Sequence, residues 1–480
     1  MCGFITITQR NTGKYSDKII TSALMSTWHD LSLRGQDAFG IGKLSQNTFA
    51  AHSLLSISDP EKAQPQPRFL AYEPTSIVYN GEVFSVDGKK WRPSDDHPCD
   101  TSFLLEYIQQ HGPDNLDRVD GMFAFAYHQA SENRLITVRD RYGEKPLFYY
   151  HCDELFICSS SPFAIARTLS SLTGCAPSFS PENVIEFLLF GACGGIRTIY
   201  EKIHSHPSGT YGNLSLDNWR FSFARFWRSP LPLENPASIT LTGSFSYLGA
   251  LRESIREQIE IIVPSYSHAM LLSGGVDSAL VAHLHPNPKD ILAYTARFRD
   301  ACFNSEDERA AQTAERAGIR LEYVDISESD LVESLEEILM KQSYPIDDTS
   351  CLMVNLLSRA IQEKNRVCLT GDGADELFFG YSSYQYRFSS LVDYASLRFQ
   401  TSVVARSLVE SVAPKDAQHI AAALQKIIDA NIIGSCNMDN LAPFVELARQ
   451  YDVEFYMKQI VLAKVDMASM LNNVECRTPF

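Results

Sequence analysis

Short apolar strands alternate with helices in the second half of the chain, and this alternation restricts the fold more than any other feature. Strands are expected at 269–272, 291–298, 321–326 and 367–370, and the first of them precedes a helix at 278–284. Strands and helices that alternate in this way form a parallel sheet, which binds ligands at the carboxyl ends of its strands. The sequence therefore predicts an α/β domain with a binding site at that edge of the sheet.

The first half has a different pattern, in which short β-like runs are split by turns. Such runs predict an α+β domain of sheets covered by helices. Prolines and glycines weaken the pattern after about residue 205. We therefore expect a first domain at 1–205, a linker at 206–245 and a second domain at 246–480. The expected strands of the first domain lie at 3–8, 76–79, 122–127, 135–139, 147–150 and 155–158, and its helices at 17–33 and 101–111.

The charge balance and the cysteines exclude several classes of protein. The 480 residues include 42 basic and 58 acidic side chains, for a net charge of −16, whereas binding to a nucleic-acid duplex needs clustered Lys and Arg. The 11 cysteines form no C-x-x-C pair, which argues against a zinc site or a thioredoxin-like motif. Their scatter along the chain favours reduced thiols in a cytoplasmic protein. The N-terminus lacks the pattern of a secretory signal, and no apolar run reaches the roughly 18 residues of a membrane span. We therefore expect neither a nucleic acid nor a membrane as partner.

A cysteine directly follows the initiator methionine. Removal of Met1 would leave Cys2 with a free α-amine, whose pKa of about 7.7–8.0 lets it act as a base for its own thiol. The thiol would then be a nucleophile without a separate histidine. Taken alone, Cys2 is more simply explained as a small residue near a chain terminus, so its role depends on the rest of the sequence.

Two loops in the second half have the composition of a phosphate site. Residues 273–278 read S-G-G-V-D-S between an expected strand and helix, so that glycines admit phosphate oxygens and the helix supplies N–H groups. The loop lacks the lysine of a Walker sequence. Residues 370–378 read T-G-D-G-A-D-E-L-F, with three carboxylates within five residues. Acidic side chains this close to a phosphate favour a bridging divalent cation.

The first half resembles the class II glutamine amidotransferases, which use an N-terminal nucleophile. The resemblance rests on the opening M-C-G, on R-G-Q-D at 34–37, on A-H-S-L-L-S-I at 51–57, on Y-N-G-E at 79–82 and on C-D-T at 99–101. It implies a layered αββα domain in which Cys2 attacks the carboxamide of glutamine. It further implies that Asn80 and the Gly81 N–H hold the oxyanion, and that Glu82 and Asp100 bind the amine end of glutamine.

The chain departs from this family at one position that matters for binding. The family places an arginine at the position of Leu54, where it pairs with the α-carboxylate of glutamine. Leucine cannot make that bidentate contact. Either another cation takes its place or glutamine binds weakly.

The second half resembles the N-type ATP pyrophosphatases, and among them the asparagine synthetases. The resemblance rests on the loops at 273–278 and 370–378, on P-I-D-D-T-S at 345–350, on K-V-D-M-A-S-M at 464–470 and on V-E-C-R-T-P-F at 474–480. It implies that Asp277 and Asp375 share Mg²⁺ with pyrophosphate, and that Asp372 stands where the family has an acid that helps ammonia attack the adenylate. Arg297 replaces a usual glycine and could crowd the adenine pocket. The residues implied to bind ATP are Leu271, Ser273, Gly274, Gly275, Asp277, Ser278, Ala296, Thr370 and Gly371.

These resemblances imply that glutamine, ATP and aspartate are converted to asparagine, AMP, pyrophosphate and glutamate. Two alternatives stay open: an enzyme of the same kind that amidates another carboxylate in a biosynthetic pathway, and a paralogue that binds nucleotide without turnover. In the family, roughly another hundred residues follow the position of Phe480 and include a lysine that contacts the ATP phosphates. The second domain therefore looks truncated, and we expect weak adenylation unless a homodimer or a separate chain completes it.

Overall fold

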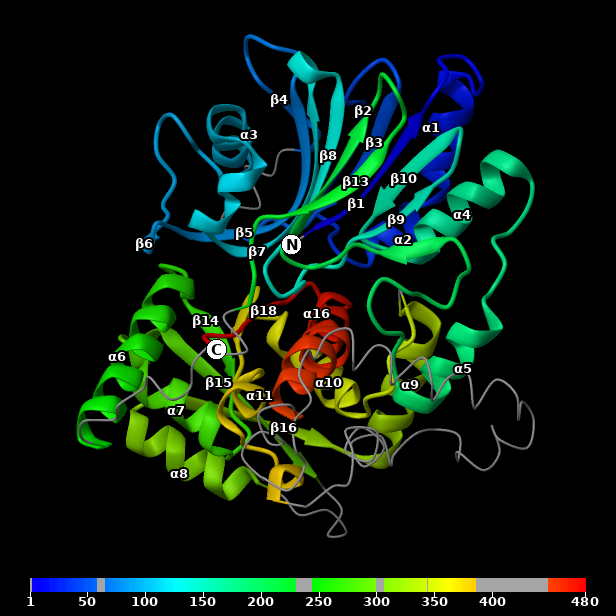
Figure 1. Ribbon diagram of the computed structural model, residues 1–480. Helices are drawn as coiled ribbons and strands as arrows, with labels where there is room; N and C mark the ends of the chain where they lie inside the picture. The colour runs from blue at the N-terminus through cyan, green and yellow to red at the C-terminus, as the bar shows by residue number, and fades with distance from the viewer. Residues whose placement is uncertain (1, 58–64, 230–243, 299–305, 343, 386–447) are drawn as a thin grey trace, which may run out of the picture.

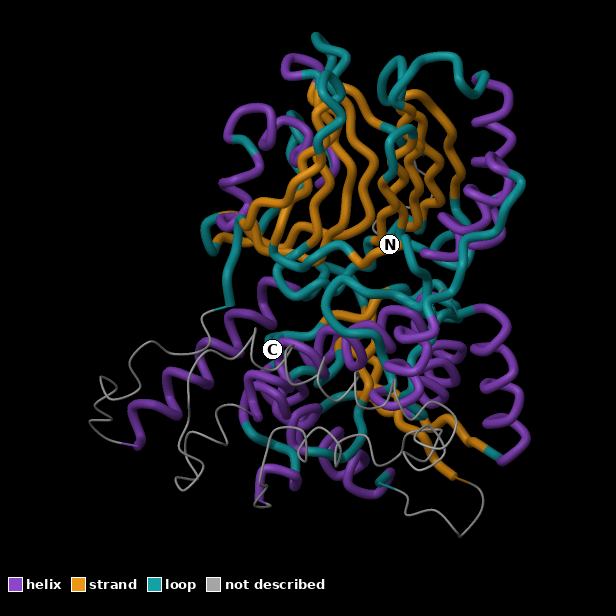
Figure 2. Tube along the Cα trace, turned by 45° about the vertical axis from the view of Figure 1, so that its right-hand side comes forward, coloured by secondary structure: helices purple, strands orange, loops and turns teal. Residues whose placement is uncertain are grey.

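The computed structural model describes residues 2–57, 65–229, 244–298, 306–342, 344–385 and 448–480. These residues form two domains, which Figure 1 shows one above the other, with the C-terminus near the junction. Sheets make up most of the upper domain, whereas helices surround the sheet of the lower domain (Figure 2). The expected division into an α+β domain and an α/β domain is confirmed.

Two antiparallel sheets lie face to face in the first domain. Their strand orders are β11-β9-β10-β1-β3-β2 and β13-β12-β8-β7-β5-β4, and β6 pairs with β5. Helices α1 and α4 cover the first sheet and α3 covers the second, which makes the expected αββα layers. The elements are β1 (Cys2–Gln9), α1 (Asp17–Ser26), α2 (Trp28–Ser32), β2 (Ala38–Lys43), β3 (Thr48–Leu54), β4 (Arg68–Phe69), β5 (Ser76–Val86), β6 (Lys89–Lys90), α3 (Asp100–His111), β7 (Val119–Gln129), β8 (Arg134–Arg139), β9 (Phe148–His151), β10 (Leu155–Ser159), α4 (Pro162–Thr173), α5 (Pro181–Phe190), β11 (Ile203–Ser205), β12 (Thr210–Ser215) and β13 (Phe221–Arg225).

Alternate residues of each strand face opposite sides of its sheet, because the strand period is two. In β1, Phe4 packs between the two sheets, whereas Ile5 packs toward α1 and α4. In β7, Ala124 faces the other sheet and Phe123 packs toward α3. Both neighbours of β1 in the first sheet are antiparallel strands, β3 and β10. The fold therefore places Cys2 at the beginning of an interior strand.

The first domain extends further along the chain than the expected boundary at residue 205. Strands β12 and β13 fall within the expected linker, 206–245, yet β12 pairs with β8 and β13 pairs with β12 at the edge of the second sheet. Tyr211 and Leu214 of β12 are buried, so this short strand contributes to the core. The turn between the two short strands includes Trp219, which has a positive φ of 61°. Because this turn residue is not a glycine, the sequence does not show the two strands as a hairpin. Residues 230–243, which carry the clustered prolines, lie outside the described ranges.

The second domain is built on a parallel sheet with the strand order β16-β15-β14-β17-β18. All of its strand pairs are parallel, as the alternation of strands and helices predicts. The elements are α6 (Ser244–Ile262), β14 (His268–Leu271), α7 (Val276–Leu284), β15 (Ile291–Phe298), α8 (Asp307–Ala317), β16 (Arg320–Ile326), α9 (Glu328–Lys341), α10 (Ser350–Ile361), β17 (Val367–Leu369), α11 (Ala374–Phe378), a π-helical segment (Asp452–Val461), α16 (Leu462–Met470) and β18 (Glu475–Arg477).

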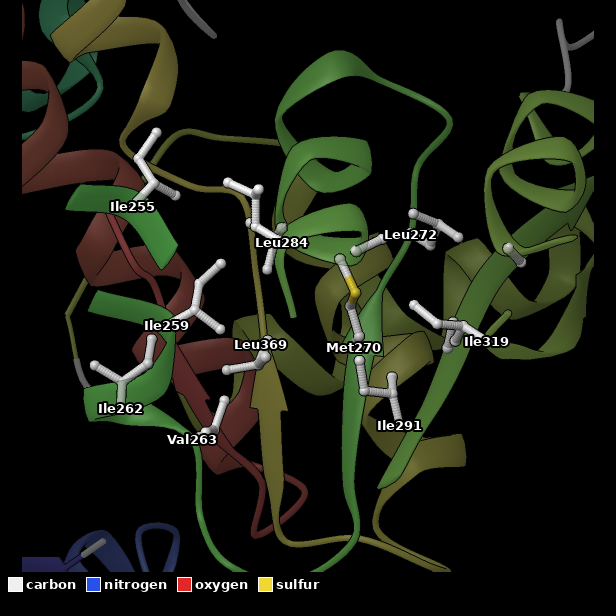
Figure 3. Close-up of a cluster of buried hydrophobic side chains, with 14 of the residues drawn as sticks. Ile255, Ile259, Ile262, Val263, Met270, Leu272, Leu284, Ile291, Ile319 and Leu369 are labelled. Atoms are coloured by element: carbon white, nitrogen blue, oxygen red, sulfur yellow. The ribbon is translucent and has the colours of Figure 1, made fainter. Parts of the chain in front are cut away.

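Apolar side chains fill both faces of this sheet. On the face shown in Figure 3, Ile259 of α6 belongs to one cluster with Met270 of β14 and Leu369 of β17. On the other face, Leu357 of α10 and Val465 of α16 pack against the strands. Helix α16 is therefore part of the core of the second domain.

The order of the strands reverses at β14. The chain passes from β14 to β15 and β16 on one side, and then returns to form β17 on the other side of β14. Met270 of β14 pairs with Leu369 of β17 in parallel register. The loops that leave these two adjacent strands therefore open at the same edge, in the crevice where α/β sheets bind ligands.

Direct contacts join the two domains. The Lys90 ammonium donates to the carbonyl oxygens of Glu260, at 2.8 Å, and Val263, at 2.5 Å, near the end of α6. The Phe148 and Tyr344 rings lie 5.3 Å apart across the junction. No helix in the described ranges combines the length and apolar composition needed to cross a bilayer. The cysteines in these ranges are free thiols.

Two buried histidines in the second domain make hydrogen bonds that require both rings to be neutral. The Nε2 atoms of His268 and His285 lie 3.0 Å apart, and the Asn287 N–H donates to His285 Nδ1 at 3.1 Å. His268 Nδ1 lies 2.9 Å from the Tyr266 carbonyl oxygen. This arrangement is satisfied when one Nε2–H donates to the other Nε2, so neither ring carries a charge. Burial lowers the pKa of His285 to about 4 and also lowers the pKa of His268.

The free energy of unfolding is therefore expected to decrease as the pH falls from about 6.5 toward 4. In that window the imidazoles of the unfolded chain bind protons that the folded rings do not bind, so acid favours unfolding. Above pH ~6.5 both states are neutral, and the histidine pair contributes its full stabilisation to the folded state. Urea denaturation at pH 7 and pH 4.5 should show a loss of about 1–3 kcal/mol from this pair. His285→Gln keeps both hydrogen bonds but cannot titrate, so its loss should be smaller. Equal losses in the two proteins would contradict the assignment.

Candidate active sites

The main chain of Cys2 is held on both sides in the first domain. Its N–H donates to Asn80 Oδ1 at 2.9 Å, and its carbonyl oxygen accepts from Arg34 Nε at 3.2 Å. Asn80 lies in β5, which packs against β1, so the two sheets together fix the residue. Cys2 is 5% exposed, and burial raises the pKa of its thiol. A thiol in this environment needs a base close by in order to become a nucleophile.

Asn80 is buried beside Cys2 and has one hydrogen-bond donor without a partner among the described residues. It is fully buried, and its Oδ1 is occupied by the Cys2 N–H, whereas its Nδ2 has no hydrogen-bond partner among the described residues. A buried donor of this kind is costly unless a ligand uses it. At Gly81 a Cβ would collide with the Met122 carbonyl oxygen of β7, so only glycine allows this approach of the two strands. These observations agree with the expectation that Asn80 Nδ2 and the Gly81 N–H together donate to an oxyanion.

Glu82 and Asp100, expected to bind the amine end of glutamine, lie near the same strand. Asp100 Oδ2 accepts from the Tyr79 hydroxyl at 2.9 Å, and Oδ1 accepts from the Thr101 N–H at 2.8 Å. Burial raises the pKa of Asp100, and burial raises the pKa of Glu82 to about 8. Arg477 of the second domain lies 3.5 Å from Glu82 Oε1. A ligand ammonium would favour the ionised form of both carboxyl groups.

Leu54 stands directly beside Cys2, the candidate nucleophile. It pairs with Cys2 in the antiparallel register of β1 and β3, so the position where the resemblance implies an arginine lies next to Cys2. Arg34, the cation that touches Cys2, has an Nη2 without a hydrogen-bond partner among the described residues. Its Nε and Nη1 are used by Cys2 and Asp466.

Leu54→Arg is expected to lower the KM for glutamine by about ten- to a hundredfold, because a bidentate contact with the α-carboxylate is worth roughly 1.5–3 kcal/mol. Initial rates of glutamate release at varied glutamine concentrations would measure the change. Leu54→Gln, which is polar but uncharged, is the control and should improve KM much less. A wild-type KM in the low micromolar range would show that another cation already binds the carboxylate.

The loop 273–278 joins β14 to α7 in the second domain. Gly274 has a φ of 79°, and a Cβ there would lie 2.7 Å from the Glu306 carbonyl oxygen, so the loop requires glycine. The Ser278 hydroxyl lies 3.3 Å from the Ser273 N–H and folds the loop back on itself. Gly275 precedes α7 and offers no side chain to its first N–H groups, so the helix start can bind an anion.

The second loop packs directly against the first. At Gly371 a Cβ would lie 3.1 Å from the Ser278 nitrogen, which is why this position needs a small residue. Both loops line one cavity of about 650 Å³ at the carboxyl ends of β14, β15 and β17. Gly274 is the one expected ATP residue outside the cavity lining, because it lies behind the loop against α8. The expected residues that line the cavity are Leu271, Ser273, Gly275, Asp277, Ser278, Ala296, Thr370, Gly371, Asp372 and Asp375.

Carboxylates crowd the part of this cavity nearest the loops. Burial raises the pKa of Asp277, and the negative charges of Asp375 and then Asp372 raise it further. A divalent cation would relieve this repulsion, and its preferred ligands are carboxylate oxygens. Among the described residues, no three His, Cys, Asp or Glu side chains are assembled as a metal site.

Arg297 does not enter the cavity, contrary to the expectation that it could crowd the adenine pocket. Its guanidinium pairs with Asp325 Oδ1 of β16 at 2.6 Å and lies 4.8 Å above the Tyr323 ring. Ala296 and Phe298, its neighbours in β15, line the cavity instead. The alternation of side chains along a strand explains the difference.

The structure adds a cation to the site for which the sequence indicated no role. Lys464 of α16 lines the cavity, and its Nζ lies 3.1 Å from Asp348 Oδ2 and 2.6 Å from the Ser350 hydroxyl. Burial lowers the pKa of Lys464, but the charges of Asp372 and Asp348 outweigh burial and raise it. Lys464 therefore stays charged. Its membership in the K-V-D motif, and that of Asp348 in P-I-D-D-T-S, were the signals in the sequence.

A small cavity lies at the junction of the two domains. Its volume is about 20 Å³, which is enough for roughly one molecule the size of water. Residues of both domains line it: Glu144, Lys145, Thr370, Asp372, Leu462, Val465, Asp466, Cys476, Arg477 and Thr478.

Comparison with known proteins agrees with this division. Residues 1–227 match the family described as a glutamine amidotransferase domain, and residues 247–480 match the family described as asparagine synthase. A putative glutamine-hydrolysing asparagine synthetase of Mycobacterium tuberculosis is 25% identical over 95% of this chain and 74% of its own. Asparagine synthetase 3 of Bacillus subtilis is 28% identical over 73% of this chain and 59% of its own. Amidase chry2 of Gibberella zeae is 24% identical over 84% of this chain and 61% of its own.

Proposed function

The chain belongs to the glutamine-hydrolysing asparagine synthetase family, with an amidotransferase domain followed by an asparagine synthase domain, and on this premise we propose that it makes an amide from a carboxylate, ATP and glutamine. One observation carries the proposal. The Arg477 guanidinium lies 3.5 Å from Glu82 in the first domain, while the Arg477 carbonyl oxygen accepts from the Thr370 N–H in the ATP loop at 2.9 Å. The two candidate sites therefore adjoin the same residue.

The first half-reaction takes place at Cys2. Its thiol passes a proton to the α-amine that removal of Met1 exposes, and the thiolate attacks the carboxamide carbon of glutamine. The Asn80 Nδ2 and the Gly81 N–H stabilise the oxyanion, and each such donor is worth roughly 2.7–4 kcal/mol. The α-ammonium then gives its proton to the leaving nitrogen, ammonia leaves, and water hydrolyses the thioester to glutamate and the free thiol. The small cavity beside Asp466 supports the passage of ammonia through the interior.

The second half-reaction takes place in the large cavity. A carboxylate oxygen of the acceptor attacks the α-phosphorus of ATP, pyrophosphate leaves, and ammonia then displaces AMP from the acyl-adenylate. The backbone of the loop 273–278 and the start of α7 bind the phosphates. Asp277 and Asp375 would hold Mg²⁺, which neutralises charge on the phosphates. Asp372 takes a proton from the attacking ammonia.

The acceptor that we propose first is aspartate, with asparagine as product. A second candidate acceptor is the carboxylate of a molecule larger than aspartate. The size of the cavity, about 650 Å³, and its aromatic lining by Phe298, Tyr381 and Tyr456 favour this candidate, as does the similarity to a fungal amidase. Both candidates use the same two half-reactions.

Product analysis tests the proposal. The full chain is incubated with ATP, Mg²⁺, either glutamine or ammonium, and aspartate or one of a panel of other acids. AMP, pyrophosphate and one amide should form in equal amounts, and the acid that supports them identifies the acceptor. Formation of ADP in place of AMP would refute the acyl-adenylate. If no acid of the panel supports ATP–pyrophosphate exchange, the result would favour a paralogue without turnover.

A further inference from the structure

Helix α16 carries two charged side chains to different domains. Lys464 and Asp466 are two positions apart, so they lie about 200° apart around the helix axis. Lys464 lines the ATP cavity, where it pairs with Asp348 at 3.1 Å. Asp466 instead contacts two cations of the first domain. One buried helix therefore touches both candidate sites.

The contact of Asp466 with the first domain is buried. Asp466 Oδ2 lies 2.7 Å from Arg34 Nη1, and Asp466 Oδ1 lies 3.1 Å from Lys145 Nζ. All three side chains are at most 5% exposed. A buried ion pair contributes little net stability compared with apolar packing, but loss of one partner leaves a charge buried alone. Loss of Asp466 would therefore leave Arg34 and Lys145 as buried cations without this partner.

Arg34 connects this contact to the nucleophile. Its Nε donates to the Cys2 carbonyl oxygen at 3.2 Å, while its Nη1 is held by Asp466. On the other side, the Cys2 N–H is held by Asn80. Of these two holds on the main chain of Cys2, the one through Asn80 belongs to the first domain alone. The one through Arg34 is completed by a side chain of the second domain.

We propose that Asp466 is a positioning residue through which the second domain holds Arg34 against Cys2 and so sets the geometry of the glutaminase nucleophile. The proposal rests on the proposed function, since it assigns Cys2 as the nucleophile. Asp466 touches neither Glu82 nor Asp100 in the contacts that the structure shows. Its loss should therefore affect the reaction of bound glutamine more than the binding of glutamine.

The test compares Asp466→Asn with wild-type full-length protein. Asp466→Asn removes the charge and keeps the shape, so Arg34 loses its ion pair. The kcat for glutamate release is expected to fall about ten- to a hundredfold, because small displacements of a reacting group have effects of this size. The KM for glutamine should change less than about threefold. Asp466→Glu, which restores the charge, should recover most of the rate and also keeps the test valid if Asp466→Asn does not fold.

A second readout does not need an acceptor or turnover. A glutamine analogue with a diazoketone in place of the amide alkylates the nucleophile, and mass spectrometry measures the adduct on Cys2. Alkylation of Asp466→Asn should be slower by the same factor as its kcat. Absence of the adduct in wild-type protein would overturn the proposed function of Cys2. An adduct that forms equally fast in wild-type protein and Asp466→Asn would overturn only the role of Asp466.

Lys90→Met is the matched control, because it removes another charge across the junction of the domains without a contact to Cys2. Its kcat should stay within about twofold of wild type, and its melting temperature shows the cost of a weakened junction. If the loss of kcat follows the decrease in melting temperature in the same way in Lys90→Met and in Asp466→Asn, Asp466 has a structural role and the inference is contradicted.

Discussion

Cys2→Ala is expected to abolish glutamine-dependent amide formation and to leave ammonia-dependent formation close to wild type. The nucleophile and the ATP cavity lie in different domains, so loss of the thiol removes the source of ammonia and not its acceptor. Loss of a nucleophile costs about a thousandfold or more in rate. The measurement is AMP release with saturating ATP and acceptor, with either glutamine or ammonium as nitrogen donor.

Cys175→Ala is the control for this variant, because Cys175 is an exposed thiol of the same domain. It should use both nitrogen donors as wild type does. The intact mass of the wild-type protein should show that Met1 is absent, since the α-amine of Cys2 is the proposed base. Retained Met1, or glutamine-dependent synthesis by Cys2→Ala, would contradict the assignment of the nucleophile.

Asp277→Asn and Asp375→Asn are each expected to abolish adenylate formation with either nitrogen donor. Each change removes one negative oxygen donor from the cavity, and a hard cation binds neutral amides less well than carboxylates. Because the metal stabilises charge on the phosphates, we expect losses of about a hundredfold or more. ATP–pyrophosphate exchange in the presence of the acceptor measures this step without ammonia.

Asp325→Asn serves as the control, since Asp325 pairs with Arg297 outside the cavity. It should retain the exchange activity. Glutamate release by Asp277→Asn and Asp375→Asn should persist, because Cys2 lies in the other domain. Exchange at the wild-type rate in both aspartate variants would refute their assignment to the metal.

The parallel sheet could be predicted from the sequence because its signals are local. Each strand is a short apolar run followed by a helix, and the glycine loop marks the edge where ligands bind. The strands at 210–215 and 221–225 were not predicted, because they are short and Trp219 makes a turn that no glycine marks. The boundary of the first domain was therefore placed too early.

Within the sites, residues close in sequence could be predicted together and residues distant in sequence could not. The loop 273–278 and the pair Asn80 and Gly81 are contiguous, so a motif describes each of them. The contacts of Arg477 with Glu82 and of Asp466 with Arg34 join residues hundreds of positions apart. No local pattern encodes such a contact. Arg297 is different, because the alternation of side chains along a strand is a local signal and predicts that Arg297 and Ala296 face opposite sides of the sheet.

The position of β18 in the sheet has a consequence for biosynthesis. Roughly a hundred residues of chain separate β17 from β18. The backbone pairing of these two strands, in which Cys368 lies beside Cys476, therefore closes a long loop and forms late. During translation the first domain leaves the ribosome earlier and folds first. Asp466 and Arg477 reach it only after α16 and β18 have been synthesised. If Asp466 positions Cys2 as proposed, glutamine hydrolysis by a nascent chain stays slow until α16 has packed against the first domain.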